Sequence, residues 1–358
     1  GDTVLCQAKS PLGLYDLESV QSFPIQLTSP LITVTTSVSQ MTNETLLETL
    51  RGELGQWDFL KGILTMFNLV SMVDETNADN ILIEPYSDVF INNTNSGNTG
   101  NLTLAARSIE HDWTDKIDVS EMELKPLTDL NKNTIFKFAE DDDDYVFNVY
   151  KQANSGYLYG SKELDASGFT ILEGTKEIIA EPFAATVSKP LMSQYPDLIV
   201  PSIYAMSEDG TCEGFDNAPR IFYNNGEKSL TSCSPHVPAQ NGSSDYYLTT
   251  FLQFSHLSDV PSVTTTPQTR DFVFESQNLI SGLGASPTDN LFSLYWEPYF
   301  NELYDANTRT MTLKVNLSPS DISSFKMYDT VFIKNRTFRV NKIQYKPNSL
   351  ATVEFILI

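Results

Sequence analysis

Hydrophobic and polar residues alternate along the chain at two different periods. In segment 57–68 the apolar positions recur at every fourth residue, the spacing of one face of an α-helix. These positions are Phe59, Ile63 and Phe67. Two apolar runs, Leu69–Val73 and Ile81–Glu84, then flank a polar turn and predict a β-hairpin. We therefore expect a helix-hairpin unit in which the helix buries its apolar stripe, formed by Phe59, Ile63 and Phe67, against its own hairpin.

The C-terminal pattern has the period of two that is typical of strands. Strands are predicted at Arg309–Leu317, Thr330–Lys334, Thr337–Tyr345 and Ala351–Ile358. Ser318-Pro-Ser-Asp321 predicts a short helical turn with Pro near its first position. The last strand ends in VEFILI, which would be sticky as a bare edge. We expect it to be paired within a small barrel or by a neighbouring subunit.

The middle of the chain is less regular. Short strand-like runs separated by turns are predicted at Thr134–Phe138, Tyr145–Tyr150, Tyr157–Tyr159 and Thr170–Glu173. From about residue 191 the composition shifts to scattered Pro, Gly, Asn and Ser with two cysteines, which indicates a loop-rich insertion. Near the N-terminus, the β-branched run Pro30–Ser39 predicts a strand.

These patterns predict a β-rich α+β fold with small β-barrel units, a helix-hairpin element and a loop-rich insertion. Four segments are expected. Residues 1–110 hold the N-terminal strand and the helix-hairpin unit, and 111–190 form a β-rich domain. Residues 191–285 form the inserted subdomain, and 286–358 form the C-terminal barrel or meander.

Charge narrows the classes of partner. The chain has 46 acidic and 23 basic residues, a net charge of −23. Duplex DNA binding depends on Lys and Arg that neutralise phosphates, so we expect no DNA binding. The charge would suit a conduit through which DNA slides, although solubility alone also explains it. No apolar run approaches the roughly 18–20 residues that span a bilayer, and GDTVLCQAKS at the start of the sequence lacks the pattern of a signal peptide.

The acidic run Glu140–Asp144 is the first candidate site. Hard cations bind several carboxylate oxygens, so calcium is one interpretation. The run lacks the glycine and the terminal bidentate glutamate of an EF-hand loop. We favour a solvated or lumen-facing turn between two strands.

Cysteine and histidine form a second candidate. Cys212, Cys233 and His236 have the spacing C-x₂₀-C-x₂-H, with His256 further along the chain. Structural zinc needs four nitrogen or sulfur ligands in a closed site, and no second close pair is present. A zinc site, a Cys212–Cys233 disulfide and two ordinary thiols all remain open, and we favour the thiols. With Cys6, the sparse and odd cysteine count fits assembly in a reducing compartment.

No catalytic motif is evident in the sequence. We find no nucleophile elbow, zinc-protease helix, phosphate loop or dinucleotide fingerprint. The histidines available for a catalytic triad are His111, His236 and His256. We therefore expect no catalytic, cofactor-binding or metal-binding residues and no enzymatic activity.

Two segments resemble bacteriophage tail hub proteins. The first is Trp57–Val70 (WDFLKGILTMFNLV) with the following Ile81–Tyr86 (ILIEPY). The second is Leu291–Tyr304 (LFSLYWEPYFNELY) with the strands after it. Tyr157–Gly160 and Ile178–Phe183 are weaker matches, and the section from Leu191 to Gln268 matches nothing we can place.

The resemblance implies a baseplate-hub-like tail protein built from small barrels. Such a chain would form a homotrimeric ring in the virion tail, assembled in the host cytoplasm. It would contact tail-tube, distal-tail and spike or tip proteins, and DNA would pass through its lumen without specific binding. Two alternatives remain open: a receptor- or glycan-binding surface module, based on the Tyr-, Asn- and Ser-rich region Tyr204–Tyr247, and a tail-associated glycan hydrolase.

Overall fold

The computed structural model describes thirteen stretches of the chain. They are 54–74, 77, 79–92, 108–126, 130–192, 195–203, 218–230, 234, 236–237, 244, 246–258, 270–276 and 287–358. The strand predicted at Pro30–Ser39 lies outside the described residues. The coarse fold prediction is confirmed, because strands dominate the described residues and a few short helices accompany them.

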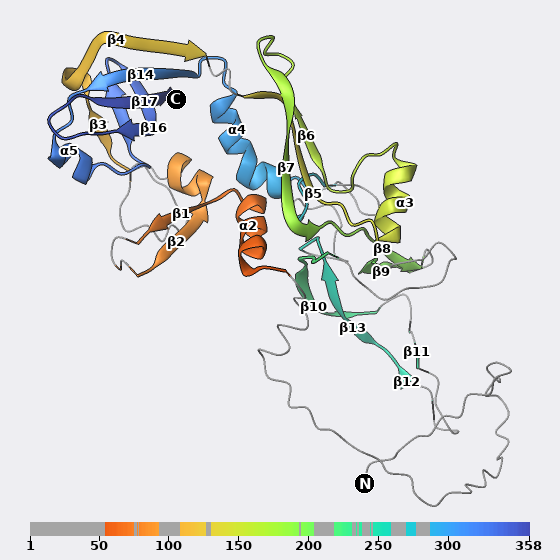
Figure 1. The fold of residues 1–358 in the computed structure, drawn as a ribbon. Coiled ribbons are helices and arrows are strands. Elements are labelled where there is room, and N and C mark those ends of the chain that lie inside the picture. Colours follow the sequence, from red (N-terminus) through yellow and green to blue (C-terminus); the bar gives the residue numbers. More distant parts are fainter. Residues whose placement is uncertain are drawn as a thin grey trace, which may run out of the picture. The chain divides into compact units, whose positions relative to one another are not determined.

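The largest sheet joins strands from distant parts of the sequence (Figure 1). Its order is β3-β15-β16-β17-β14-β4. The bounds are β3 (Glu110–Asp112), β4 (Ile117–Pro126), β14 (Arg309–Val315), β15 (Thr330–Ile333), β16 (Arg336–Gln344) and β17 (Ala351–Leu357). All neighbours are antiparallel except β3 and β15, which are parallel. The sheet therefore combines strands of the predicted segments 111–190 and 286–358.

The connection between β3 and β4 requires this sheet to be rolled. A flat sheet of six strands would hold its edge strands roughly 24 Å apart. The edge strands are nevertheless joined by residues 113–116, including the 3₁₀-helix η2 (Thr114–Lys116), and a fully extended connection would reach at most about 18 Å. β3 and β4 do not pair with each other, so the sheet curls without closing. No closed barrel occurs among the described residues.

The concave face of the rolled sheet holds one hydrophobic core. Trp113 is almost fully buried there, and its ring lies 6.1 Å from that of Phe355. Two local elements lie around it, and one of them, the helical turn that starts at Ser318, was predicted. Lys334 and Asn335 form the two-residue turn between β15 and β16 with φ values of 45° and 66°, as a type I′ hairpin needs. Ser318 caps α5 (Pro319–Ser324) in a capping box.

The C-terminal strand is not an edge. β17 lies between β14 and β16 and pairs with both. Of the two expectations for VEFILI, pairing within its own sheet is therefore correct, and the strand needs no neighbouring subunit.

A second core surrounds a three-stranded sheet of order β6-β5-β7. Its strands are β5 (Asn131–Ala139), β6 (Lys162–Asp165) and β7 (Glu173–Ala184). The helices packed in this region are α2 (Gln56–Met66), α3 (Tyr145–Ala153), the π-helix η3 (Phe292–Trp296) and α4 (Glu297–Leu303). The hairpin β1 (Leu69–Val73) and β2 (Ile81–Pro85) follows α2, and the π-helix η1 (Ser87–Ile91) follows the hairpin.

The predicted helix is confirmed, but its predicted packing is wrong. The ring of Phe59 lies 5.0 Å from Phe183 on β7, and Phe67 contacts Phe272 and Tyr295. Figure 1 shows α2 beside β7. The stripe faces β7 and η3 because a two-stranded hairpin offers too little surface to bury a helix.

Three of the strand predictions in the middle of the chain are wrong. Residues 145–150 belong to helix α3, residues 157–159 lie in turns and connecting chain, and residues 170–171 form a turn before β7. The strand predicted at 134–138 is confirmed within β5.

The remaining described strands form three two-stranded sheets. They are β8 (Ser188–Met192) with β9 (Tyr195–Pro201), β10 (Tyr223–Ser229) with β13 (Thr250–Ser255), and β11 (His236–Val237) with β12 (Tyr246–Tyr247). Among the helices that the structure describes, none is both long and apolar enough to cross a membrane.

Candidate assembly surface

The segments Trp57–Val70 and Leu291–Tyr304, singled out in the sequence, meet in the structure. Trp296 donates a hydrogen bond from its indole Nε1 to the backbone carbonyl of Thr65 over 3.1 Å. Asn68 donates from Nδ2 to the carbonyl of Tyr295, also over 3.1 Å. These bonds satisfy polar groups at the end of α2 and join it to η3. Residues more than two hundred positions apart therefore form one wall.

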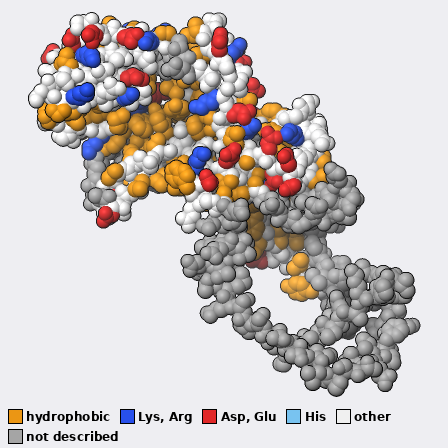
Figure 2. All heavy atoms as spheres, in the orientation of Figure 1, with side chains coloured by type: hydrophobic (Ala, Val, Ile, Leu, Met, Phe, Trp, Pro, Cys, Tyr) orange, Lys and Arg blue, Asp and Glu red, His pale blue; other side chains and the backbone are white. Residues whose placement is uncertain are grey.

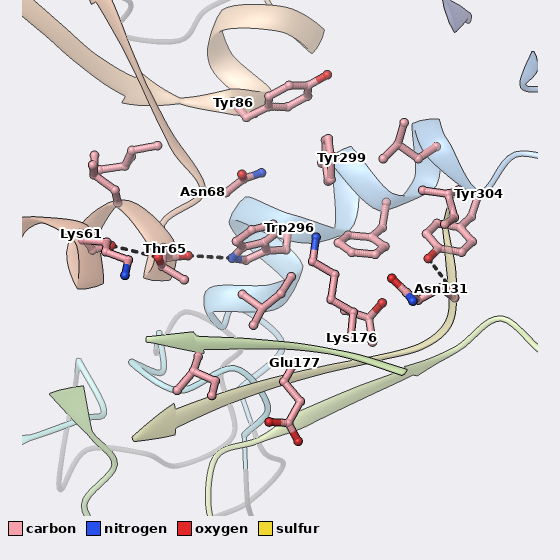
Figure 3. Close-up of a pocket in the computed structure, with 18 residues that line it drawn as sticks. Lys61, Thr65, Asn68, Tyr86, Asn131, Lys176, Glu177, Trp296, Tyr299 and Tyr304 are labelled. Carbon is pink, nitrogen blue, oxygen red and sulfur yellow. Dashed lines mark hydrogen bonds between the residues drawn. The ribbon is translucent and has the colours of Figure 1, made fainter. Parts of the chain in front are cut away.

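A groove of about 640 Å³ opens beside this wall (Figure 3). Residues from α2, β5, β7, η3 and α4 line it, together with Tyr86. The phenol of Tyr304 donates to the carbonyl of Asn131 at the start of β5 over 2.7 Å. Burial, with a smaller contribution from the charge of Glu302, raises the pKa of Tyr86. Hydrogen bonds thus hold Tyr304 and Trp296 in place at the groove.

The charged residues of the groove are mainly basic. Lys61 and Lys176 line it, and both are exposed. Neither forms an ion pair within the described part of the chain. The acidic residue beside them, Glu177, points away from the groove in Figure 3 and pairs with Lys137 over 3.1 Å. An anionic group is the natural complement of such a surface.

Strand β4 is an open edge of the rolled sheet. It pairs with β14 on one side only. Leu124 lies opposite Met311, whose side chain is in the core, so both face the concave side. Leu124 is nevertheless 57% exposed, and Val119 and Met122 are each 54% exposed. Apolar side chains of β4 are thus left uncovered along this edge.

The hairpin after α2 adds a second apolar surface. Val73 and Ile81 are directly opposite in the register and therefore share a face. They are 69% and 71% exposed. Figure 2 shows a broad band of hydrophobic side chains over the hairpin and α4. Exposed apolar patches of this kind mark interaction surfaces.

The acidic run 140–144 does not join two strands, as we had expected. It joins β5 to helix α3. Asp144 caps that helix by accepting hydrogen bonds from the amides of Val146 and Phe147. The sequence Asp144-Tyr-Val-Phe is compatible with an N-cap, a signal that the β-branched and aromatic residues obscured.

The buried carboxylates of this run share one cation. Arg220 lies 2.6 Å from Asp141 and 3.1 Å from Asp144, with all three side chains almost fully buried. Burial raises the pKa of Asp144, against the opposing effects of its amide partners and Arg220. Asp142 and Asp143, in contrast, are exposed at the tip of the turn.

The histidines occupy separate sites. His256 is buried, with Nδ1 2.7 Å from Asp271 and Nε2 2.7 Å from the hydroxyl of Tyr159. His111 lies 2.9 Å from Asp329 in the rolled sheet. Each ring therefore links neighbouring segments of its own core.

The zinc and disulfide candidates cannot be placed. Cys6, Cys212 and Cys233 lie outside the described residues, as does the side chain of His236. Within the described ranges, no group of three or more His, Cys, Asp or Glu has an arrangement that could hold a metal ion.

Comparison with known proteins adds no relative. No family model, no curated protein and no solved structure matches this chain.

Proposed function

We propose that this chain is a virion structural protein of a bacteriophage tail. In this proposal three copies form a hub ring in the virion, between the tail tube and the tail tip or spike, and DNA passes through the ring. The chain acts by assembly rather than by catalysis. It is made in the host cytoplasm and works in the assembled tail.

The open edge β4 is the observation that carries the proposal. An unpaired edge with exposed apolar side chains is a template for a strand of another chain. Here the apolar side chain of Leu124 also belongs to the concave face of the sheet. A strand added from a neighbouring tail protein would cover this side chain and extend the rolled sheet towards the closed barrel that the sequence predicted.

Charge supports the passage of DNA. With a net charge of −23, the chain repels phosphate over most of its surface, and counterion release gives it little binding energy. We therefore expect no measurable binding to duplex DNA, even at low salt.

A glycan-binding module is the second candidate. Tyr246 and Tyr247, in the region that suggested this alternative, are exposed by 68% and 57%. Consecutive residues of a strand point to opposite faces, so these two rings cannot form one flat platform for a sugar. A binding assay with host-surface oligosaccharides distinguishes the candidates, because a hub ring should not bind them.

Cryo-electron microscopy of the intact virion tests the proposal. The expected density is a closed threefold or pseudo-sixfold ring on the tail axis, with a channel wide enough for duplex DNA and a wall rich in Asp and Glu. Finding the chain in a peripheral fibre or as a capsid decoration would overturn the hub assignment.

A further inference from the structure

The groove and the acidic turn are complementary surfaces of the same chain. The groove carries two exposed lysines, Lys61 and Lys176, without ion-pair partners in the described residues. The turn carries two exposed aspartates, Asp142 and Asp143, that likewise have none. The chain has a net charge of −23, so a second copy offers acidic segments that can complement these lysines.

The acidic tip is held in a fixed conformation. Asp141 and Asp144, on either side of the tip, are tied to Arg220. Asn148 donates from Nδ2 to the carbonyl of Asp142 over 2.7 Å. The nearby cation Lys151 is bonded to Glu140, although the charge of Asp142 also contributes to its raised pKa. A preformed tip loses little conformational entropy on binding.

The two surfaces lie at opposite ends of one strand. Asn131 and Thr134, near the start of β5, line the groove. The acidic turn begins directly after Ala139, where β5 ends. Lys176 lies opposite Thr134 in the register, five residues before Ala139, so at about 3.3 Å per residue it is roughly 17 Å from the end of the strand. Because Arg220 holds both sides of the tip in place, the tip does not reach the lysines of its own chain.

We infer that the acidic turn of one copy docks in the lysine-flanked groove of the next copy. Asp142 and Asp143 would pair with Lys61 and Lys176, and the aromatic side chains of the groove would exclude water from the contact. An interface between two different surfaces is head-to-tail, and it closes into a ring when the rotation between copies permits. The inference rests on the proposed ring and specifies the contact that holds its copies together.

Charge reversal tests the contact in the full chain. The variants are K61E/K176E, D142K/D143K and the quadruple variant that combines them. Mass photometry and sedimentation velocity give the dissociation constant of the oligomer. Each double variant should raise this constant at least tenfold, and the quadruple variant should return it to within about threefold of the unaltered protein, since exchanged charges attract again.

A matched control accounts for the change in net charge. Lys189 and Lys342 are exposed and do not line the groove. K189E/K342E changes the net charge as much as K61E/K176E does, so it should leave the dissociation constant within about threefold. Unfolding midpoints of all variants check that each chain is folded.

The outcomes separate this inference from the proposed function. If the protein forms a ring whose stability K61E/K176E changes no more than the control does, the docking is wrong and the hub stands. Failure of the quadruple variant to recover also overturns the docking. If virion images place the chain off the tail axis while the charge variants behave as expected, the hub is wrong and the docking stands. An unaltered protein that stays monomeric at all concentrations overturns the docking.

Discussion

Arg220 places Nη2 3.1 Å from Oδ2 of Asp144, with both side chains almost fully buried. The two residues are 76 positions apart, so the bond joins the start of helix α3 to a distant segment. Arg220 also bonds to Asp141 and to the carbonyl of Ala218. One guanidinium therefore fixes the turn whose exposed tip we assign to assembly.

Replacing Arg220 by leucine should destabilise the fold strongly. The change leaves Asp141 and Asp144 buried without a counter-charge, which typically costs about 3–5 kcal/mol of unfolding free energy. Urea unfolding measures the loss. The control is K151A, which removes the more exposed pair with Glu140 and should cost about 0–1 kcal/mol. An equal loss in both variants would show that Arg220 is not a structural centre.

Helix α3 shows why local pattern misled the sequence interpretation. The run YVFNVY is rich in residues that favour strands. The structure nevertheless satisfies the first amides of a helix through Asp144 and buries Val146 and Phe147 in the core. Tertiary packing overrides a weak local preference here. Arg220, which supports the cap, is 76 positions away from Asp144, so no short stretch of sequence contains both residues.

Gly62→Ala should destabilise the protein although alanine is the better helix former. Glycine inside a helix costs about 1 kcal/mol relative to alanine. At Gly62, however, an added Cβ would lie 2.7 Å from the ring of Phe183 and closer still to the carbonyl oxygen of Glu181. Overpacking of this kind costs about 1–3 kcal/mol, so the unfolding midpoint should fall.

Gly168→Ala is the control for this prediction. A Cβ at Gly168 meets nothing within 4 Å, so the substitution should change the unfolding free energy by less than about 0.5 kcal/mol. A higher unfolding midpoint in Gly62→Ala would contradict the close approach of α2 to β7.

Asp321 should make stability depend on pH in the acid range. The Lys116 ammonium, 2.6 Å away, and the amide of Ser318 lower the pKa of Asp321 from 3.8 to about 2. A carboxylate whose pKa is lowered on folding stabilises the protein fully above its unfolded pKa and loses that effect as pH falls through the folded pKa. The difference in unfolding midpoint between the unaltered protein and D321N should be constant above about pH 4 and shrink towards about pH 2.

K116M removes the ammonium that pairs with Asp321 and is the matched variant. Its difference from the unaltered protein should shrink over the same pH range as the D321N difference. A D321N difference that grows on acidification would contradict the ion pair with Lys116.

The candidate surfaces could be predicted only in part. Regular alternation revealed the C-terminal strands because each of them packs one face on a core. The partner of β14, strand β4, lies almost two hundred residues earlier, and no local signal indicates that pairing. The groove could not be predicted for the same reason, because the hydrogen bond from Trp296 to Thr65 beside it joins residues 231 positions apart. Lys61 and Lys176 did not stand out because a charge count does not show which lysines lack partners.

Strand β4 should be needed for contact with the tail but not for folding. The double substitution M122K/L124K places charge on exposed apolar positions of the open edge, a change that natural edge strands use to prevent pairing. The unfolding free energy should change by less than about 0.5 kcal/mol per substitution, because neither side chain is buried in the isolated subunit. Co-sedimentation with tubes assembled from the tail-tube protein of the same virion should weaken at least tenfold.

L252K, at a residue that is 66% exposed on β13, is the control and should bind as the unaltered protein does. Undiminished binding of M122K/L124K would remove β4 as the assembly edge, because the charged strand could not then be buried against a neighbour.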